Sequence, residues 1–147
     1  MPAVSSNALK TALIREGFEV YRTQGSRIVL AERVRDNLIM DSGVAAVAGE
    51  PLAVRFNVRA QQSDFPGDSE EQLYNHAREQ SRPAVGRGYA EVEQLVVPVH
   101  DPGDRSRTLD TWYEVAFEKP VDSERALFEE LRYALQLDKT ASPAGRR

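Results

Sequence analysis

The sequence predicts an α+β fold: a mainly antiparallel sheet of about five to six strands with three helices packed on it. Three segments carry helix-capping residues and an apolar face, and the segments between them alternate apolar and polar side chains. Most connections between these segments are short, which favours antiparallel pairing. The expected order is helix, three or four strands, helix, two strands and helix.

The first helix is expected between a serine cap and a glycine. Ser5 or Ser6 can accept a hydrogen bond from an otherwise unpaired amide, and Gly17 can end the helix in the left-handed conformation. The face between them that repeats with helical spacing consists of Leu9, Ala12 and Leu13.

After this helix the apolar period changes to two. Residues 18–23 and 26–34 are predicted to form two strands of a hairpin around Gln24-Gly25. The next segment, 38–48, contains Gly43, which marks either a bulge in one strand or a break between two short ones.

The strand predicted at 52–61 has the clearest alternation in the first half of the chain. Its apolar set is expected to be buried and its polar set to face water. The buried set consists of Leu52, Val54, Phe56, Val58 and Ala60, and the other set of Ala53, Arg55, Asn57, Arg59 and Gln61.

A second helix is predicted from Ser69, which with Gln72 fits a capping box. Glu70 and Glu71 suit its first turn, and Pro83 is expected to stop the chain beyond its end. The weakly apolar face of this helix consists of Leu73, His76, Ala77 and Gln80.

Two strands and a helix complete the pattern. The strand at 89–99 contains Pro98, which suits an edge strand or a bulge, and 101–107 is read as a turn. The strand at 108–118 alternates strictly, and 121–123 opens the last helix. The inward set of that strand is Leu109, Thr111, Tyr113, Val115 and Phe117, and the last helix has a broad apolar face of Leu127, Phe128, Leu131, Ala134 and Leu135.

Length and composition fit one globular domain, expected over residues 1–137, with a disordered, polar tail over 138–147 that has no apolar anchor. The net charge of -4 gives no general attraction to nucleic acid or to a membrane. There is no cysteine, signal-peptide pattern or long apolar run, so a soluble cytoplasmic protein is expected. Usage rich in Arg, Ala and Val suggests a bacterial source.

The candidate groups for chemistry each have a simpler interpretation. Gly86-Arg87-Gly88 precedes a strand, whereas a phosphate loop ends at a helix N-terminus, so a flexible connection is preferred. His100 and Asp101 are adjacent in a strand and would point to opposite faces. His76 is expected to be partly buried and structural. We therefore predict no catalytic residue, no metal site and no cofactor.

The polar sheet faces offer a different kind of site. Arg55 and Arg59 form a positive row, which we expect to pair with acids on a neighbouring strand rather than to bind nucleic acid. Those acids are Asp110, Glu114 and Glu118. Trp112, the only tryptophan, falls on the same face as these acids, and a large aromatic there marks a binding surface or is covered inside the monomer.

In element order, size, acidity and lack of cysteine, residues 5–137 resemble the type III secretion chaperones and the YbjN-like regulators. No signature motif carries this resemblance, and 64–80, the sequence DFPGDSEEQLYNHAREQ, does not match one. The resemblance implies a non-catalytic, homodimeric protein that binds segments of partner proteins.

Two classes of function follow. The first is a non-catalytic protein-binding module, a small bacterial adaptor, chaperone or regulator acting as a homodimer, with Trp112, Arg55, Arg59, Asp110 and Glu114 as its partner-binding residues. The alternative is a small-ligand-binding protein or enzyme with a cleft near Arg82, Arg87 and His100. The sequence does not identify the partner.

Overall fold

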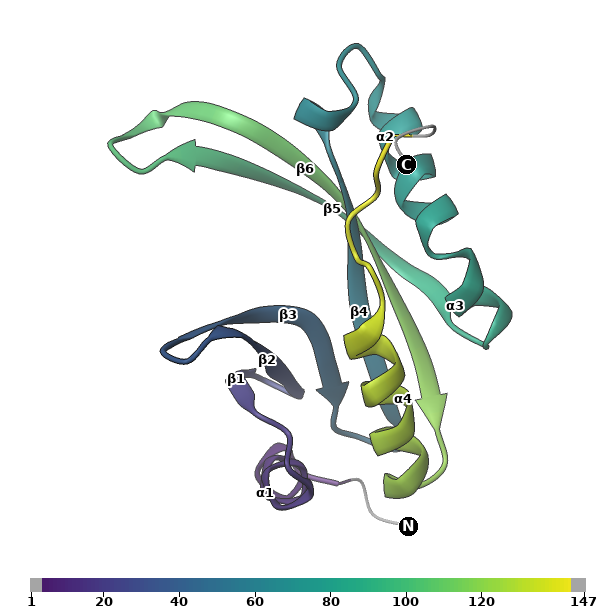
Figure 1. The fold of residues 1–147 in the computed structure, drawn as a ribbon. Coiled ribbons are helices and arrows are strands. Elements are labelled where there is room, and N and C mark those ends of the chain that lie inside the picture. Colours follow the sequence, from purple (N-terminus) through teal and green to yellow (C-terminus); the bar gives the residue numbers. More distant parts are fainter. Residues whose placement is uncertain (1–3, 144–147) are drawn as a thin grey trace. The chain divides into compact units, whose positions relative to one another are not determined.

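A computed structural model describes residues 4–143 of the chain (Figure 1). Its helices are α1 (Ser6–Glu16), α2 (Glu70–Gln80), α3 (Arg82–Gly86) and α4 (Glu124–Gln136), with a short 3-10 turn at Gln62–Asp64. Its strands are β1 (Val20–Gln24), β2 (Arg27–Arg35), β3 (Leu38–Val47), β4 (Leu52–Gln61), β5 (Ala90–Asp101) and β6 (Asp104–Val121).

The six strands form one sheet in the order β1-β2-β3-β4-β6-β5, and the α+β prediction is confirmed. The pairs β1–β2, β2–β3 and β3–β4 are antiparallel. β5 is the last strand in the order, as Pro98 indicated. Proline has no N–H to donate to a neighbouring strand, so it is tolerated where that side of the strand has no neighbour. The helix missing from the prediction is α3. It begins at Arg82, just after the end of α2 at Gln80, and Pro83 lies in its first turn, where proline is tolerated.

The chain divides into two compact units. Unit 1 comprises Met1–Phe56 and Glu118–Leu137, and unit 2 comprises Asn57–Phe117 and Asp138–Arg147. The boundaries fall within β4 and β6, so both strands contribute residues to each unit.

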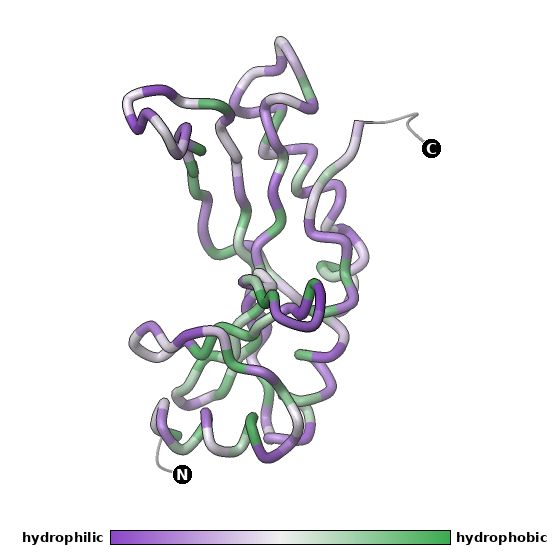
Figure 2. Tube along the Cα trace, turned by 60° about the vertical axis from the view of Figure 1, so that its left-hand side comes forward, coloured by the Kyte–Doolittle hydropathy of each residue, from purple (hydrophilic) through white to green (hydrophobic). Residues whose placement is uncertain are grey.

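Unit 1 is built around α1, the first three strands and α4. Ser5 caps α1 by accepting a hydrogen bond from the Ala8 amide, and Gly17 ends it with φ 103°, as predicted. In Figure 2 the trace of α1, next to the N-terminus, changes repeatedly between hydrophilic and hydrophobic residues. The fully buried side chains of this unit include Leu9, Leu13, Ile28, Leu30, Val44, Val54, Phe56, Leu127 and Leu131.

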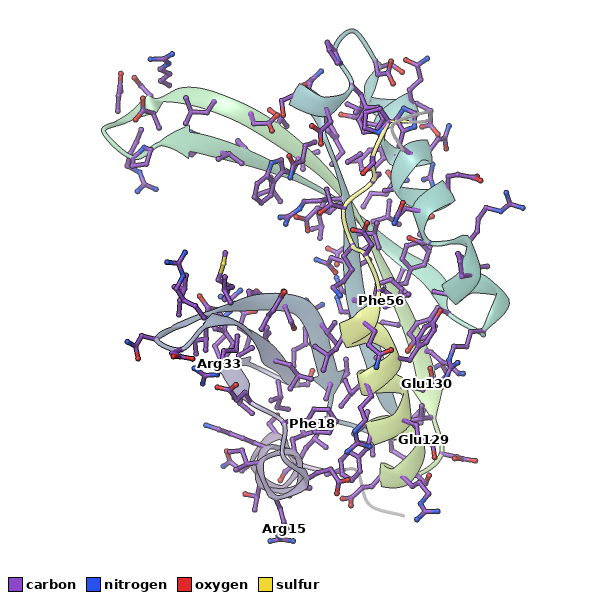
Figure 3. All side chains as sticks on the ribbon, in the orientation of Figure 1. Arg15, Phe18, Arg33, Phe56, Glu129 and Glu130 are labelled. Atoms are coloured by element: carbon purple, nitrogen blue, oxygen red, sulfur yellow. The ribbon has the colours of Figure 1, made fainter. Side chains whose placement is uncertain are left out.

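Phe18 joins the end of α1 to α4. Its ring lies 5.8 Å from that of Phe128, and the guanidinium carbon of Arg132 lies 5.1 Å from its centroid. Figure 3 labels Phe18 beside α1. Arg132 also donates to Glu16 at 2.9 Å. Aromatic contact and ion pairing therefore fix these two helices at one point.

Gly43 marks a bulge in a continuous β3 rather than a break between strands. The β2–β3 register shifts between the pairs Val29–Ala45 and Ala31–Asp41, and Gly43 has φ 78°, a conformation that glycine adopts without strain. The neighbouring Ser42 is buried, and its hydroxyl donates to the Leu30 carbonyl at 2.7 Å.

Arg55 is buried, although the alternation of β4 placed it on the wet face. Arg55 and Glu118 both belong to unit 1, and the Arg55 guanidinium donates to the Glu118 carboxylate at 3.1 Å. Arg55 is only 6% exposed. The partner strand was predicted correctly, because β4 and β6 are neighbours. A buried guanidinium needs such a carboxylate, so Arg55 is a structural charge within unit 1.

Unit 2 contains α2 and α3, packed with parts of β4, β5 and β6. The capping box of Ser69 and Gln72 is present in full, with hydrogen bonds of 3.2 Å and 2.7 Å. Tyr74, which was not assigned to the apolar face, is buried with Leu73 and Ala77. One core cluster of this unit consists of Ala60, Phe65, Leu73 and Ala141, with Tyr113 packed against it.

The strand β6 is longer than predicted, and its outer part is exposed. β6 begins at Asp104, so the turn is confined to Pro102-Gly103, and Figure 1 shows β5 and β6 as one long hairpin. Val115 and Phe117 are buried as expected, but Leu109 is 53% exposed. Burial along β6 does not alternate as predicted, since Ala116 is buried between Val115 and Phe117, and nothing among the described residues covers the outer end of the strand.

The segment following α4 is bound to unit 2. Thr140 pairs in parallel with Arg59, and Ala141 is 2% exposed within the core cluster. Ala141 is thus an apolar anchor that the sequence did not indicate. Residues 144–147 of the predicted tail lie outside the described residues.

Candidate functional site: the Trp112 face

The centre of the candidate site is Trp112 on β6, in unit 2. The guanidinium carbon of Arg59, on the neighbouring strand β4, lies 4.1 Å from the centroid of the indole ring. A guanidinium at this distance is attracted by the ring quadrupole and restrains the ring. Trp112 as a whole residue is partly buried.

Asp110 holds the other end of the arrangement. Its carboxylate accepts hydrogen bonds from the Ser63 amide at 3.0 Å, the Ser63 hydroxyl at 2.8 Å and the Thr111 amide at 2.8 Å. Partial burial acts to raise the pKa of Asp110, but these bonds, together with one from the Trp112 indole, hold that pKa below its ordinary value. The carboxylate is therefore kept ionised as an acceptor for Ser63 and for the Thr111 amide.

Two further contacts complete the face. Asn57 of β4 donates to the Glu114 carboxylate of β6 at 3.1 Å, and the Arg59 Nε–H donates to the Thr140 hydroxyl at 3.3 Å. We define the Trp112 face as Asn57, Arg59, Asp110, Trp112 and Glu114. The structure brings these five residues of unit 2 together, whereas Arg55 belongs to the ion pair in unit 1.

The arrangement favours binding over proton transfer. The charged groups of the Trp112 face hydrogen-bond or stack on neighbours within the unit, which leaves the aromatic surface as its least satisfied part. An indole restrained by a guanidinium that lies over it loses less side-chain entropy when it enters an interface. The face therefore has the character of a preorganised aromatic anchor.

The residues of the alternative cleft do not lie together. Arg82 is on α3 and pairs with Glu79 at 2.8 Å, and Arg87 follows α3 directly. His100 is exposed near the far end of β5. At about 3.3 Å per residue, the ten residues from Ala90 to His100 span roughly 33 Å. A cleft shared by these three side chains is excluded by this separation.

His76 has the structural surroundings predicted for it. Its Nε2 lies 2.7 Å from the Asp68 carboxylate, and its ring stacks on Phe65 at 4.0 Å. Both partners belong to the segment that leads into α2. The histidine therefore fastens that segment to the helix.

Sequence reasoning missed Ser63 and Thr140, the two hydroxyl residues that orient Asp110 and Arg59. Each lies in an irregular segment, where no periodicity indicates which side chain turns toward a site. The one available signal is a polar residue close to a strand end, since Ser63 lies two residues after the end of β4.

Other exposed apolar side chains lie outside this face. In unit 1, Val34 of β2 and Leu38, Ile39 and Met40 of β3 are all exposed at the end of one hairpin. In unit 2, Val92 and Val96 of β5 are about half exposed. Nothing among the described residues covers either set.

Comparison with known proteins gives no relative: no family model matches the chain, and no curated protein or solved structure matches it significantly. Within residues 4–143, no cluster of three or more His, Asp or Glu side chains is arranged to hold a metal ion. None of the described helices combines the length and the apolar character required to span a bilayer. The resemblance in element order remains a prediction.

Proposed function

We propose that the protein is a non-catalytic protein-binding module, an adaptor, chaperone or regulator, that acts as a homodimer and binds its partner through the Trp112 face. The observation that carries the proposal is a partly buried tryptophan with the guanidinium carbon of Arg59 lying 4.1 Å from its ring centroid. Tryptophan and arginine are the residue types that contribute most energy in protein interfaces. The expected partner is a protein segment, and neither a cofactor nor nucleic acid is required.

The proposal separates binding from folding. Removing the indole of Trp112 deletes the aromatic part of the face, while the fully buried core of unit 2 remains intact. Leu109, on the same strand and 53% exposed, offers a matched control for the loss of an exposed apolar side chain.

Affinity capture from an extract of the source cells tests this function. The tagged wild type and Leu109→Ala should retain the same partner, and Trp112→Ala should lose it by roughly tenfold or more, because interface tryptophans are worth about 2 kcal/mol or more. Light scattering on the purified chain tests the homodimer. Equal capture by all three proteins would show that the face is not the binding site.

A further inference from the structure

The β2–β3 hairpin of unit 1 carries an exposed set of side chains on one face near its turn. Glu32 is paired with Met40, and Arg35 with Leu38. Residues directly opposite each other in an antiparallel pair lie on the same face, and so do residues two apart on one strand. We define the hairpin face as these four residues. All four are exposed, Met40 by 52% and Leu38 by 40%.

The hairpin face continues a face that is buried further along the same strands. Leu30, two residues before Glu32, is 1% exposed, and Ser42, two residues after Met40, is 5% exposed. The Ser42 hydroxyl donates to the Leu30 carbonyl at 2.7 Å, so these two residues lie next to each other. Leu38 and Met40 therefore extend the apolar face of unit 1 beyond the part that the described residues cover.

The charged residue on the opposite face of the hairpin is satisfied within the unit. Arg33 is paired with Ile39, so both lie on that face, and Figure 3 labels Arg33. The Arg33 guanidinium donates to both carboxylate oxygens of Glu19 and, at 2.7 Å, to the Asp36 carbonyl. Arg33 is thus part of the internal structure of unit 1 and has less to offer a partner than the hairpin face.

The two charges of the hairpin face, in contrast, are open. Neither the Glu32 carboxylate nor the Arg35 guanidinium makes an ion pair or a side-chain hydrogen bond within the described part of the chain. They stand at the two ends of the face, Glu32 beside Met40 and Arg35 beside Leu38. The face therefore has a negative end and a positive end, each with an apolar side chain alongside.

We propose that the hairpin face is the surface through which two copies of this chain pair. A two-fold axis that runs across the strands would bring Glu32 of each copy over Arg35 of the other, and Met40 over Leu38. Both charges and both apolar side chains then meet a complementary group, and each contact is formed twice. The proposal rests on the homodimer proposed above and assigns it to a surface of unit 1. The Trp112 face, in unit 2, remains the site for the protein partner.

The charge pattern favours a second copy as the occupant. Opposite charges occupy the two positions that the two-fold axis exchanges, so the face is complementary to its own rotated image. An unrelated protein would need the same arrangement of charged and apolar groups to match it. Four side chains from each copy make a small interface, so we expect a dissociation constant on the order of micromolar.

Sedimentation equilibrium of the full chain tests the apolar part of the face. Met40→Asp should raise the dissociation constant of the dimer at least about tenfold, because it places a carboxylate where an apolar contact is buried. Ile14→Asp is the matched control, since Ile14 is a 54% exposed apolar residue of the same unit, on α1, and this variant should dimerise as the wild type does. A wild type that is monomeric at all concentrations, or a folded Met40→Asp chain that dimerises equally well, would overturn the proposal.

Reversal of the two charges tests the two-fold pairing itself. Glu32→Arg and Arg35→Glu each place like charges over one another in both halves of the dimer, and each should raise the dissociation constant about tenfold. The double variant restores opposite charges in exchanged positions and should return the constant to within about threefold of the wild type. Because neither residue is paired within one described copy, internal contacts do not explain such a rescue. Additive losses in the double variant would contradict the proposal.

Further outcomes separate this proposal from the proposed function. A dimer that persists in every hairpin variant would place the interface elsewhere, so the hairpin proposal falls and the proposed function stands. If the wild type is monomeric and Glu32→Arg loses the captured partner protein, the hairpin face belongs to that partner and the proposal is overturned. Trp112→Ala should keep the dimer and lose the partner. If it keeps both while the charge reversal behaves as expected, partner binding by the Trp112 face falls and the hairpin dimer stands.

Discussion

Arg59 and Trp112, on the neighbouring strands β4 and β6, form a cation–π pair with 4.1 Å between the guanidinium carbon and the ring centroid. Arg59 also donates a hydrogen bond to the Thr140 hydroxyl at 3.3 Å, which restrains the guanidinium that lies over the ring. The ring is thus restrained before any partner binds.

A double-mutant cycle measures this pair. Arg59→Ala and Trp112→Ala each remove other contacts as well, but the cycle isolates their coupling, which we expect to be about 0.5–2 kcal/mol in the free energy of unfolding. Urea unfolding of the four proteins provides the values. Additive single effects would show that the stacking contributes nothing to stability.

Leu131 tests the core of unit 1. Its side chain is fully buried on α4, so Leu131→Ala should leave a cavity and lower the free energy of unfolding by about 2–5 kcal/mol. The control is Ile14→Ala on α1, where the side chain is 54% exposed and the loss should be under about 0.5 kcal/mol. A loss that small at Leu131 would mean that this face of α4 is available to a partner.

Ala141 tests whether the C-terminal segment contributes to the stability of unit 2. Ala141→Asp places a carboxylate in an apolar cluster and should cost about 2–4 kcal/mol, or release the segment from β4 at a similar cost. Thermal unfolding followed by circular dichroism gives the change. Ser142→Asp, one residue further along, should be close to neutral, and equal losses in both variants would argue against the anchor.

The sequence predicted the elements well, because capping residues and apolar periods are local signals. Ser5, Gly17 and the Ser69–Gln72 box are all found where these signals placed them. Pro98 correctly indicated an edge strand. α3 was missed because five residues are too short to show a helical period.

The environment of each face could not be predicted in the same way. Alternation assigned Arg55 and Leu109 to faces, but burial depends on which other segment covers the strand, and both assignments of exposure failed. Ala141 gave no signal, since a single small residue becomes an anchor only through its pairing with β4. Four of the five residues of the Trp112 face were among the predicted partner-binding residues, whereas Asn57 was assigned only to the polar set of its strand, and Ser63 and Thr140 were not named.

The ion pair of Glu91 with Arg78 should make part of the stability of unit 2 depend on pH in the acidic range. Arg78 donates two hydrogen bonds to it, at 2.9 and 3.1 Å, and these bonds hold the pKa of Glu91 below its ordinary 4.5. A lowered folded-state pKa contributes stability above about pH 4.5, and this contribution is lost as the pH falls through the lowered value.

Glu91→Gln should therefore flatten the fall in stability below about pH 4.5, with its largest effect near neutral pH. Melting temperatures measured from pH 3 to pH 7 test this. Glu129→Gln, which changes an exposed carboxylate on α4, serves as the control. Parallel curves for wild type and Glu91→Gln would contradict the assignment.

Substitution of His100 tests the alternative function, a ligand-binding protein or enzyme, at the histidine of its proposed cleft. The residue is exposed on β5, far from Arg82 and Arg87, so His100→Ala should change the free energy of unfolding by less than about 0.5 kcal/mol and leave partner capture intact. If a measurable activity disappeared with stability unchanged, the assignment as a non-catalytic protein would be wrong.

The most direct test of the central claim uses Trp112 itself, which is the only tryptophan in the chain. Replacing it with 5-fluorotryptophan gives one ¹⁹F resonance that reports the face even in a crude extract, where tryptophans of other proteins are silent. The resonance should shift and lose its H₂O/D₂O dependence on addition of the captured partner, while Asp110→Asn should weaken this response. An unchanged, solvent-sensitive resonance in the presence of saturating partner would contradict the account.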